Sequence, residues 1–326
     1  MNSFTFSRAR SVADALRHSH GNVRFLAGGT TLIDLMKLDV ERPSEVIDIN
    51  ALPLAELTRT PDGGLSIGAL ARNSDVAHNP DVVRDYPLLS QALRSGASVQ
   101  LRNMASTGGN LLQRTRCVYF RDPAMACNKR SPGSGCAAIG GFNRNLAILG
   151  TSAHCIATNP SDQNVALAAL EATVHFTGPN GERGVPIDDF YFLPGETPDR
   201  ETILEPGDLV TSVTLPPPAA GARSIYLKLR DRASYEFALA SAAVVATVSD
   251  GTMQRVRIAM GGVATKPWRN LDLEMALQGQ PATRERFTEA AQILLSDAKP
   301  QSGNGFKVEL AKRCLVHALS LATAVA

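Results

Sequence analysis

The feature that most constrains this chain is residues 105–162, which contain four of its five cysteines. The stretch begins with the glycine turn Thr107-Gly108-Gly109-Asn110 and ends with Asn159-Pro160-Ser161-Asp162, a typical helix start. Prolines and glycines in between interrupt any helical or strand period. The stretch therefore predicts an irregular loop, framed by the rest of the chain. Nine, eight and eighteen residues separate its cysteines, Cys117, Cys127, Cys136 and Cys155.

The spacing of these cysteines leaves their ligand open. There is no Cys-x-x-Cys pair, which most zinc ribbons and many iron–sulfur proteins contain. An iron–sulfur cluster, zinc, and disulfides or free thiols all remain alternatives. Nearby cations would offset the negative charge of four thiolates, which favours a cluster over a merely solvated loop. These cations are Arg114, Arg116, Arg121, Lys129 and Arg130.

A second glycine turn lies near the N-terminus. Residues 23–27 read as a buried strand, Gly28-Gly29-Thr30-Thr31 follows, and a helix begins at Leu32. Exposed amides and hydroxyls in such a turn suit a pyrophosphate, although a plain strand–helix turn is the alternative. The turn lacks the Gly-x-Gly-x-x-Gly fingerprint, so a standard Rossmann domain is not supported. Two glycine turns in one chain suit a dinucleotide, which has two phosphates.

The remaining sequence suggests two or three domains. The chain has 326 residues, and its clearest linker is the proline-rich stretch 216–221. After the linker, strands at 224–229, 237–248 and 253–260 precede helices at 283–295 and 306–321, which indicates an α+β domain. Cys314 falls in the last helix and is expected to be an inert core thiol. The aromatic loop 190–195 could cover a planar ring or could simply be anchored by its aromatics.

Composition excludes some functions. The formal net charge of +2 argues against a general nucleic-acid or membrane-surface role. No apolar run reaches the roughly 18 residues of a membrane span. The first residues lack an apolar signal region, so we expect no signal peptide in this chain.

Two motifs resemble the flavin-binding subunits of the molybdenum hydroxylases, a family that includes xanthine dehydrogenases, carbon monoxide dehydrogenases and aldehyde oxidoreductases. They are Leu26-Ala27-Gly28-Gly29-Thr30-Thr31-Leu32 and Thr107-Gly108-Gly109-Asn110. The order of other motifs is similar, and the resemblance covers essentially the whole chain. These motifs are Ile67-Gly68-Ala69, Pro160-Ser161-Asp162 and Lys228-Leu229-Arg230.

The chain departs from most of the family by about forty extra residues before Pro160, and all four clustered cysteines lie there. Two branches are similar in this respect, the bacterial periplasmic aldehyde oxidoreductases and the 4-hydroxybenzoyl-CoA reductases. The former are more alike around the cysteines and in residues 228–235. The resemblance implies that Cys117, Cys127, Cys136 and Cys155 ligate one [4Fe-4S] cluster.

The fold implied by the resemblance is α+β. Residues 1–218 should form a two-subdomain PCMH-type FAD-binding fold, similar to vanillyl-alcohol oxidase, with the [4Fe-4S] insertion at about 113–158. Residues 222–326 should form a C-terminal domain like that of carbon monoxide dehydrogenase flavoproteins, with antiparallel strands and helices.

The resemblance also implies non-covalently bound FAD. Asp162 should accept hydrogen bonds from ribityl or ribose hydroxyls, and Lys228 should lie near the flavin ring, where a cation stabilises the anionic reduced form. No catalytic residue beyond the flavin is expected. The glycine turns should hold the pyrophosphate through Gly28, Gly29, Thr30, Thr31, Thr107, Gly108 and Asn110, and the cofactor-binding residues should also include Leu26, Ala27 and Leu32.

By the same resemblance, the chain is an oxidoreductase subunit that passes electrons to an external acceptor. Its partners would be a large molybdenum-cofactor subunit and a small subunit with two [2Fe-2S] clusters, in a heterotrimer or a multiple of it. Aldehyde and water would become a carboxylic acid. The alternatives are a complex like 4-hydroxybenzoyl-CoA reductase or xanthine dehydrogenase, a free-standing flavin oxidase, and a zinc- or cluster-stabilised binding scaffold. The compartment is periplasmic by co-export with a partner, or cytoplasmic.

Overall fold

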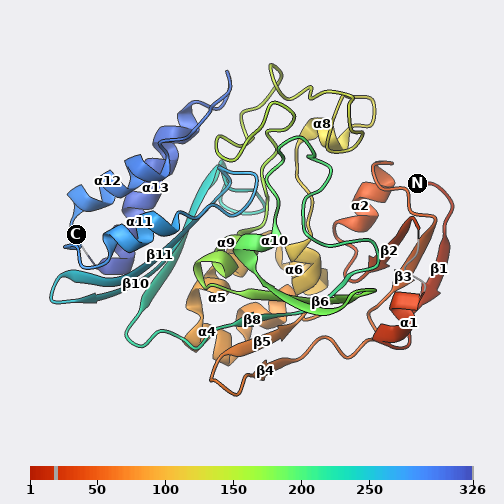
Figure 1. Cartoon of the computed structure of the whole chain (residues 1–326), viewed down its shortest axis with the longest axis horizontal. Helices are drawn as coiled ribbons and strands as arrows, with labels where there is room; N and C mark the ends of the chain where they lie inside the picture. The colour runs from red at the N-terminus through yellow and green to blue at the C-terminus, as the bar shows by residue number, and fades with distance from the viewer. Residues whose placement is uncertain (18–20, 325–326) are drawn as a thin grey trace.

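A computed structural model describes residues 1–17 and 21–324 and shows the expected α+β architecture. Three sheets build it, one in each part of Figure 1. The N-terminal sheet lies at the right, a five-stranded sheet in the lower centre, and the C-terminal domain at the left. The cysteine-containing loop and its helix α8 stand above the centre (Figure 1). This arrangement places the loop over the junction of the three parts.

The N-terminal sheet is parallel, with the strand order β1-β3-β2. Its strands are joined through helices, as parallel pairing requires. Strand β2 runs directly into the first glycine turn, and α2 begins after it. The elements are β1 (Thr5–Arg8), α1 (Val12–Arg17), β2 (Val23–Leu26), α2 (Leu32–Lys37) and β3 (Glu45–Asp48).

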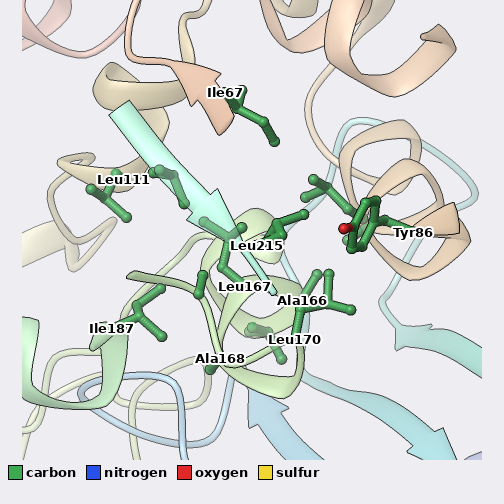
Figure 2. Packing of buried hydrophobic residues seen from close by; sticks show 14 of the residues in the cluster. Ile67, Tyr86, Leu111, Ala166, Leu167, Ala168, Leu170, Ile187 and Leu215 are labelled. Atoms are coloured by element: carbon green, nitrogen blue, oxygen red, sulfur yellow. The ribbon is translucent and has the colours of Figure 1, made fainter. Parts of the chain in front are cut away.

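The central sheet is antiparallel, with the order β4-β5-β8-β6-β7. Its strands are β4 (Leu57–Arg59), β5 (Leu65–Gly68), β6 (Thr173–Gly178), β7 (Gly181–Pro186) and β8 (Leu209–Leu215). Helix α9 (Asp162–Ala169) packs beside this sheet and is buried on all sides; Figure 2 shows Ala166, Leu167 and Ala168 among its apolar neighbours. The other helices are α3 (Asn73–His78), α4 (Pro80–Asp85), α5 (Pro87–Ser95), α6 (Val99–Met104), α7 (Thr107–Leu111) and α10 (Ile187–Phe190).

The C-terminal domain has a three-stranded antiparallel sheet, β11-β10-β9, covered by helices. The strand predicted at 237–248 begins only at Ala240, because residues 231–239 form a loop toward the centre of the molecule. Cys314 is buried in the core of this domain, as predicted. The elements are β9 (Arg223–Leu229), β10 (Ala240–Ser249), β11 (Thr252–Gly261), α11 (Leu271–Leu277), α12 (Arg284–Leu294) and α13 (Phe306–Thr323).

The cysteine-containing insertion is loop-like, as the sequence predicts. Its one named helix in the described chain is α8 (Val118–Arg121). The backbones of Cys127 and Cys136 form an isolated antiparallel β-bridge. The C-terminal domain binds the insertion at Leu146. Lys307 Nζ donates to the Leu146 carbonyl oxygen at 2.8 Å and also to that of Gly262 in its own domain. The insertion is thus integrated into the fold.

The buried position of Lys307 predicts a pH dependence of stability. Desolvation, with a smaller contribution from Arg144, lowers the pKa of Lys307 from 10.5 to about 7. Above this value the folded protein has released the proton that the unfolded chain retains, so stability rises with pH toward 10.5. Replacing Lys307 with methionine should remove this increment. Between about pH 7 and 9, the free energy of unfolding measured in urea should rise more steeply for the wild type than for the variant, by up to about 1.4 kcal/mol per pH unit. Parallel pH profiles would contradict the assignment.

Candidate functional site

A cavity of about 780 Å³ lies between the two glycine turns. Its volume falls within the roughly 300–1,000 Å³ of small-molecule and cofactor sites. The walls come from the N-terminal subdomain, the central helices, the insertion and the loop before β10. The lining includes Thr30, Thr31, Asp34, Gly96, Arg102, Gly109, Asn110, Arg116, Arg121, Pro160, Asp162, Tyr235, Glu236 and Phe237.

The first glycine turn contributes hydroxyl-bearing residues to this cavity and uses a glycine for close packing. Thr30 and Thr31 line the wall. A Cβ at Gly28 would lie 1.9 Å from the carbonyl oxygen of Met104, so only glycine lets this turn approach the chain before the second turn. Gly29 has φ +73°, which also favours glycine. Leu26, Ala27, Gly28, Gly29 and Leu32 are not among the lining residues.

The second glycine turn divides its residues between packing and the cavity. Thr107 is buried and bonds to the carbonyl of Ala71, while the amide of Gly108 donates to Ala69. Gly109 and Asn110 face the cavity. Gly109 was missing from the residues expected at the cofactor, although its place in the glycine pair could have indicated it.

Asp162 lines the cavity but is already engaged within the protein. Its carboxylate accepts from Lys228 Nζ at 2.8 Å and from the Tyr226 hydroxyl at 2.5 Å. Lys228 also donates to the carbonyl oxygen of Ser95 at 3.1 Å, and its side chain is only 3% exposed. Burial, reinforced by the Asp162 charge, raises the pKa of Tyr226 well above its usual value. Lys228 therefore lies behind Asp162 rather than on the cavity wall.

A second cavity of about 220 Å³ adjoins the first. The two share Arg116, Pro160, Asp162, Glu236 and Phe237. The smaller cavity continues toward the C-terminal domain, which contributes residues from the start of β10 and the end of β11. An elongated ligand could therefore contact all three parts of the fold.

The aromatic loop 190–195 lies away from both cavities. Phe190 and Tyr191 are buried in the central core, with their rings in edge contact at 5.0 Å between centroids. The Tyr191 hydroxyl donates to the Leu111 carbonyl at 2.8 Å. The loop is anchored by its aromatics, which was one of the two sequence alternatives; it does not cover the site.

The four clustered cysteines share one apolar cluster in the insertion, with Phe120 and Ile156 among their neighbours. All four are free thiols, and three are buried. Burial raises the pKa of Cys117 to about 11 and also raises that of Cys155. In the described part of the chain, no group of three or more His, Cys, Asp or Glu is arranged to hold a metal ion.

The cavity and the cysteine cluster each have residues of the kind that their expected cofactor needs. The larger cavity has the volume, hydroxyls and arginines that suit a phosphate-containing dinucleotide, so FAD fits. The four thiols lie in one apolar cluster, and the thiol pKa values of Cys117 and Cys155 are each influenced by other members of the set. A [4Fe-4S] cluster binds each thiolate to a different iron and so spaces its ligands more widely than one ion does.

Two family models match the chain nearly end to end. Residues 2–218 match the FAD binding domain in molybdopterin dehydrogenase, and residues 224–322 match the CO dehydrogenase flavoprotein C-terminal domain. The junction between the matches lies in the proline-rich linker.

Relatives and solved structures agree with these matches. The aldehyde oxidoreductase FAD-binding subunit PaoB of Escherichia coli (strain K12) is 49% identical, over 100% of both chains. The glyceraldehyde dehydrogenase medium chain of Sulfolobus acidocaldarius is 30% identical, over 92% of this chain and 89% of its own. A carbon monoxide dehydrogenase structure from Hydrogenophaga pseudoflava has a TM-score of 0.78 at 27% identity, covering 99% of this chain and 98% of its own. The chain belongs to the family of FAD-binding oxidoreductase subunits of the molybdenum hydroxylases.

Proposed function

We propose that this chain is the electron-transfer FAD/[4Fe-4S] subunit of a molybdenum-containing aldehyde oxidoreductase. The observation that carries the proposal is the cavity between the two glycine turns, in a chain 49% identical over its full length to an aldehyde oxidoreductase FAD-binding subunit. Relatives that act on carbon monoxide or xanthine support the same kind of subunit with another substrate. The higher identity favours an aldehyde.

When bound, FAD would supply the redox chemistry that links partner clusters to an external acceptor. Protein groups bind and orient it. Thr30 and Thr31 from the first turn, with Gly109 and Asn110 from the second, would contact its polar groups. The Asn110 side chain accepts from the Ser161 hydroxyl at 2.8 Å, which fixes the second turn to the start of α9. The site is therefore held by elements from both subdomains.

Asp162 and Lys228 would act as a pair in this site. Because Lys228 neutralises Asp162, a negative charge on the cavity wall is compensated from behind. Asp162 could still accept hydrogen bonds from ribityl or ribose hydroxyls. The Lys228 ammonium group would lie directly behind Asp162, separated from the cofactor by that side chain. This pairing keeps the wall compatible with a reduced, anionic flavin.

The [4Fe-4S] cluster would be held by Cys117, Cys127, Cys136 and Cys155 in the insertion. Their common apolar cluster supports this assignment. Lys129 lies close to Cys155, where its charge opposes the effect of burial on that thiol pKa. Loading would require all four thiols to lose their protons, so cations near the cysteines would assist it.

The partners would be a large molybdenum-cofactor subunit and a small subunit with two [2Fe-2S] clusters. The only cysteine outside the insertion is the buried Cys314, so the chain cannot supply the about four thiolates that each [2Fe-2S] centre needs. No helix in the described chain is long and apolar enough to cross a bilayer.

The flavin itself provides the direct test of this proposal. Neither glycine turn contains a histidine or cysteine that could form a covalent link to FAD. Acid precipitation of the purified chain should release one FAD per chain into the supernatant and leave a colourless protein pellet. Heat release from the same sample serves as a matched check on the amount. Flavin retained by the pellet would contradict non-covalent binding, and protein without any flavin would contradict the proposed function.

A further inference from the structure

The insertion contributes two arginines to the larger cavity. Arg116 directly precedes Cys117, and Arg121 is the last residue of α8; both line the cavity. Their side chains are 26% and 23% exposed. The segment that carries a cysteine of the insertion therefore also forms part of the flavin cavity.

A single carboxylate oxygen serves both guanidinium groups. Asp34 Oδ2 accepts from Arg121 Nη2 at 2.7 Å and from Arg116 Nη1 at 3.2 Å. Arg116 Nε and Arg121 Nη1 are shielded from solvent and have no hydrogen-bond partner among the residues that the structure describes. The pair is thus incompletely neutralised by protein groups.

The charges elsewhere on the wall do not correct this imbalance. Two further carboxylates and one further arginine line the cavity, but Lys228 already neutralises one of the carboxylates, Asp162. Within residues 1–17 and 21–324, the one hydrogen-bond partner of the Arg102 side chain is a backbone group, the Gly96 carbonyl at 2.6 Å. The cavity therefore has an excess of positive charge, and an anion would stabilise it.

We propose that Arg116 and Arg121 bind the phosphate groups of FAD, so that the insertion is part of the flavin site as well as of the cluster site. This inference rests on the proposed FAD binding. Guanidinium groups form strong, directional bonds to phosphate oxygens, and both side chains are partly exposed at the cavity wall. Flavin retention would then depend on the insertion being folded.

The test compares FAD with riboflavin, which has the same ring system but no phosphate. Titrations of the flavin-depleted complex would give both dissociation constants for the wild type and for an R116Q/R121Q variant. The variant should bind FAD at least about tenfold more weakly, with riboflavin affinity unchanged. R116K/R121K should recover part of the FAD affinity, because it keeps the charges. FAD binding by the glutamine variant should also respond less to salt.

Arg130→Gln is the matched control within the insertion. Arg130 does not line the cavity, and its guanidinium group donates to the carbonyl oxygens of Tyr119 and Phe120 at 2.7 and 2.8 Å. This change should leave the FAD-to-riboflavin affinity ratio unchanged. A double glutamine variant with the wild-type ratio would overturn the inference and leave the proposed function standing. A wild-type complex that binds no FAD would overturn both.

Discussion

Replacing Asp162 with alanine should lower the free energy of unfolding by about 3–5 kcal/mol, because it strands a buried ammonium group. Lys228 would lose its ion pair at 2.8 Å and keep only the Ser95 carbonyl, within an environment where its side chain is 3% exposed. The Tyr226 hydroxyl would lose its acceptor as well. Urea unfolding of the purified chain measures the stability, and the released flavin measures FAD retention, which should also fall.

The double variant D162A/K228M is the control for this prediction. It removes both charges, so its destabilisation should be clearly smaller than that of D162A alone. Asp162→Asn keeps the shape and a hydrogen-bond acceptor, so it separates the effect of charge from that of packing. If D162A unfolds like the wild type and retains full FAD, Asp162 does not belong to the site.

Replacing Cys127 with serine should remove the iron–sulfur cluster entirely. The wild-type complex, purified without oxygen, should contain about four iron atoms and about four acid-labile sulfides per chain. Serine is a poor substitute for thiolate in a cluster. Cys127 is also tied to a second proposed ligand, because its backbone forms an isolated β-bridge with that of Cys136. Iron and sulfide in the variant should fall close to zero by colorimetric assay.

Cys314→Ser is the matched control, because Cys314 is a buried thiol in the separate C-terminal core. It should retain the full iron and sulfide content. Burial raises the pKa of Cys314 to about 12, so this thiol stays protonated. Stoichiometric zinc without labile sulfide in the wild type, or full iron in C127S, would contradict the cluster assignment.

The sequence predicted the architecture well where local patterns decide it. The first turn follows a strand and precedes a helix as expected, and Ser161 caps α9 by accepting from the Asn164 amide at 3.0 Å. The loop character of the insertion also followed from its glycines and prolines. Prolines and glycines restrict the chain locally, so such features need no tertiary information.

The site was harder to predict because it depends on contacts between distant segments. No local pattern pairs Asp162 with Lys228, since they lie 66 positions apart in the sequence. The roles within the glycine turns likewise follow from packing: Gly28 lies against Met104, whereas Gly109 faces the cavity. The sequence predicts that the basic residues of the insertion offset the charge of the thiolates. In the structure, Arg116 and Arg121 instead reach the cavity of the neighbouring subdomains. Their tertiary partner, Asp34, gives no signal in the sequence.

We propose that this chain passes electrons between partner subunits and an acceptor. The most direct measurement is the visible absorbance of its flavin after an aromatic aldehyde is added without oxygen. In the complex with its molybdenum and [2Fe-2S] partners, the flavin band should bleach and then recover when an artificial acceptor is added. In the isolated chain, the flavin should bind but stay oxidised. Bleaching by aldehyde in the isolated chain, or an unchanged flavin in the active complex, would contradict electron transfer from partner subunits through this flavin.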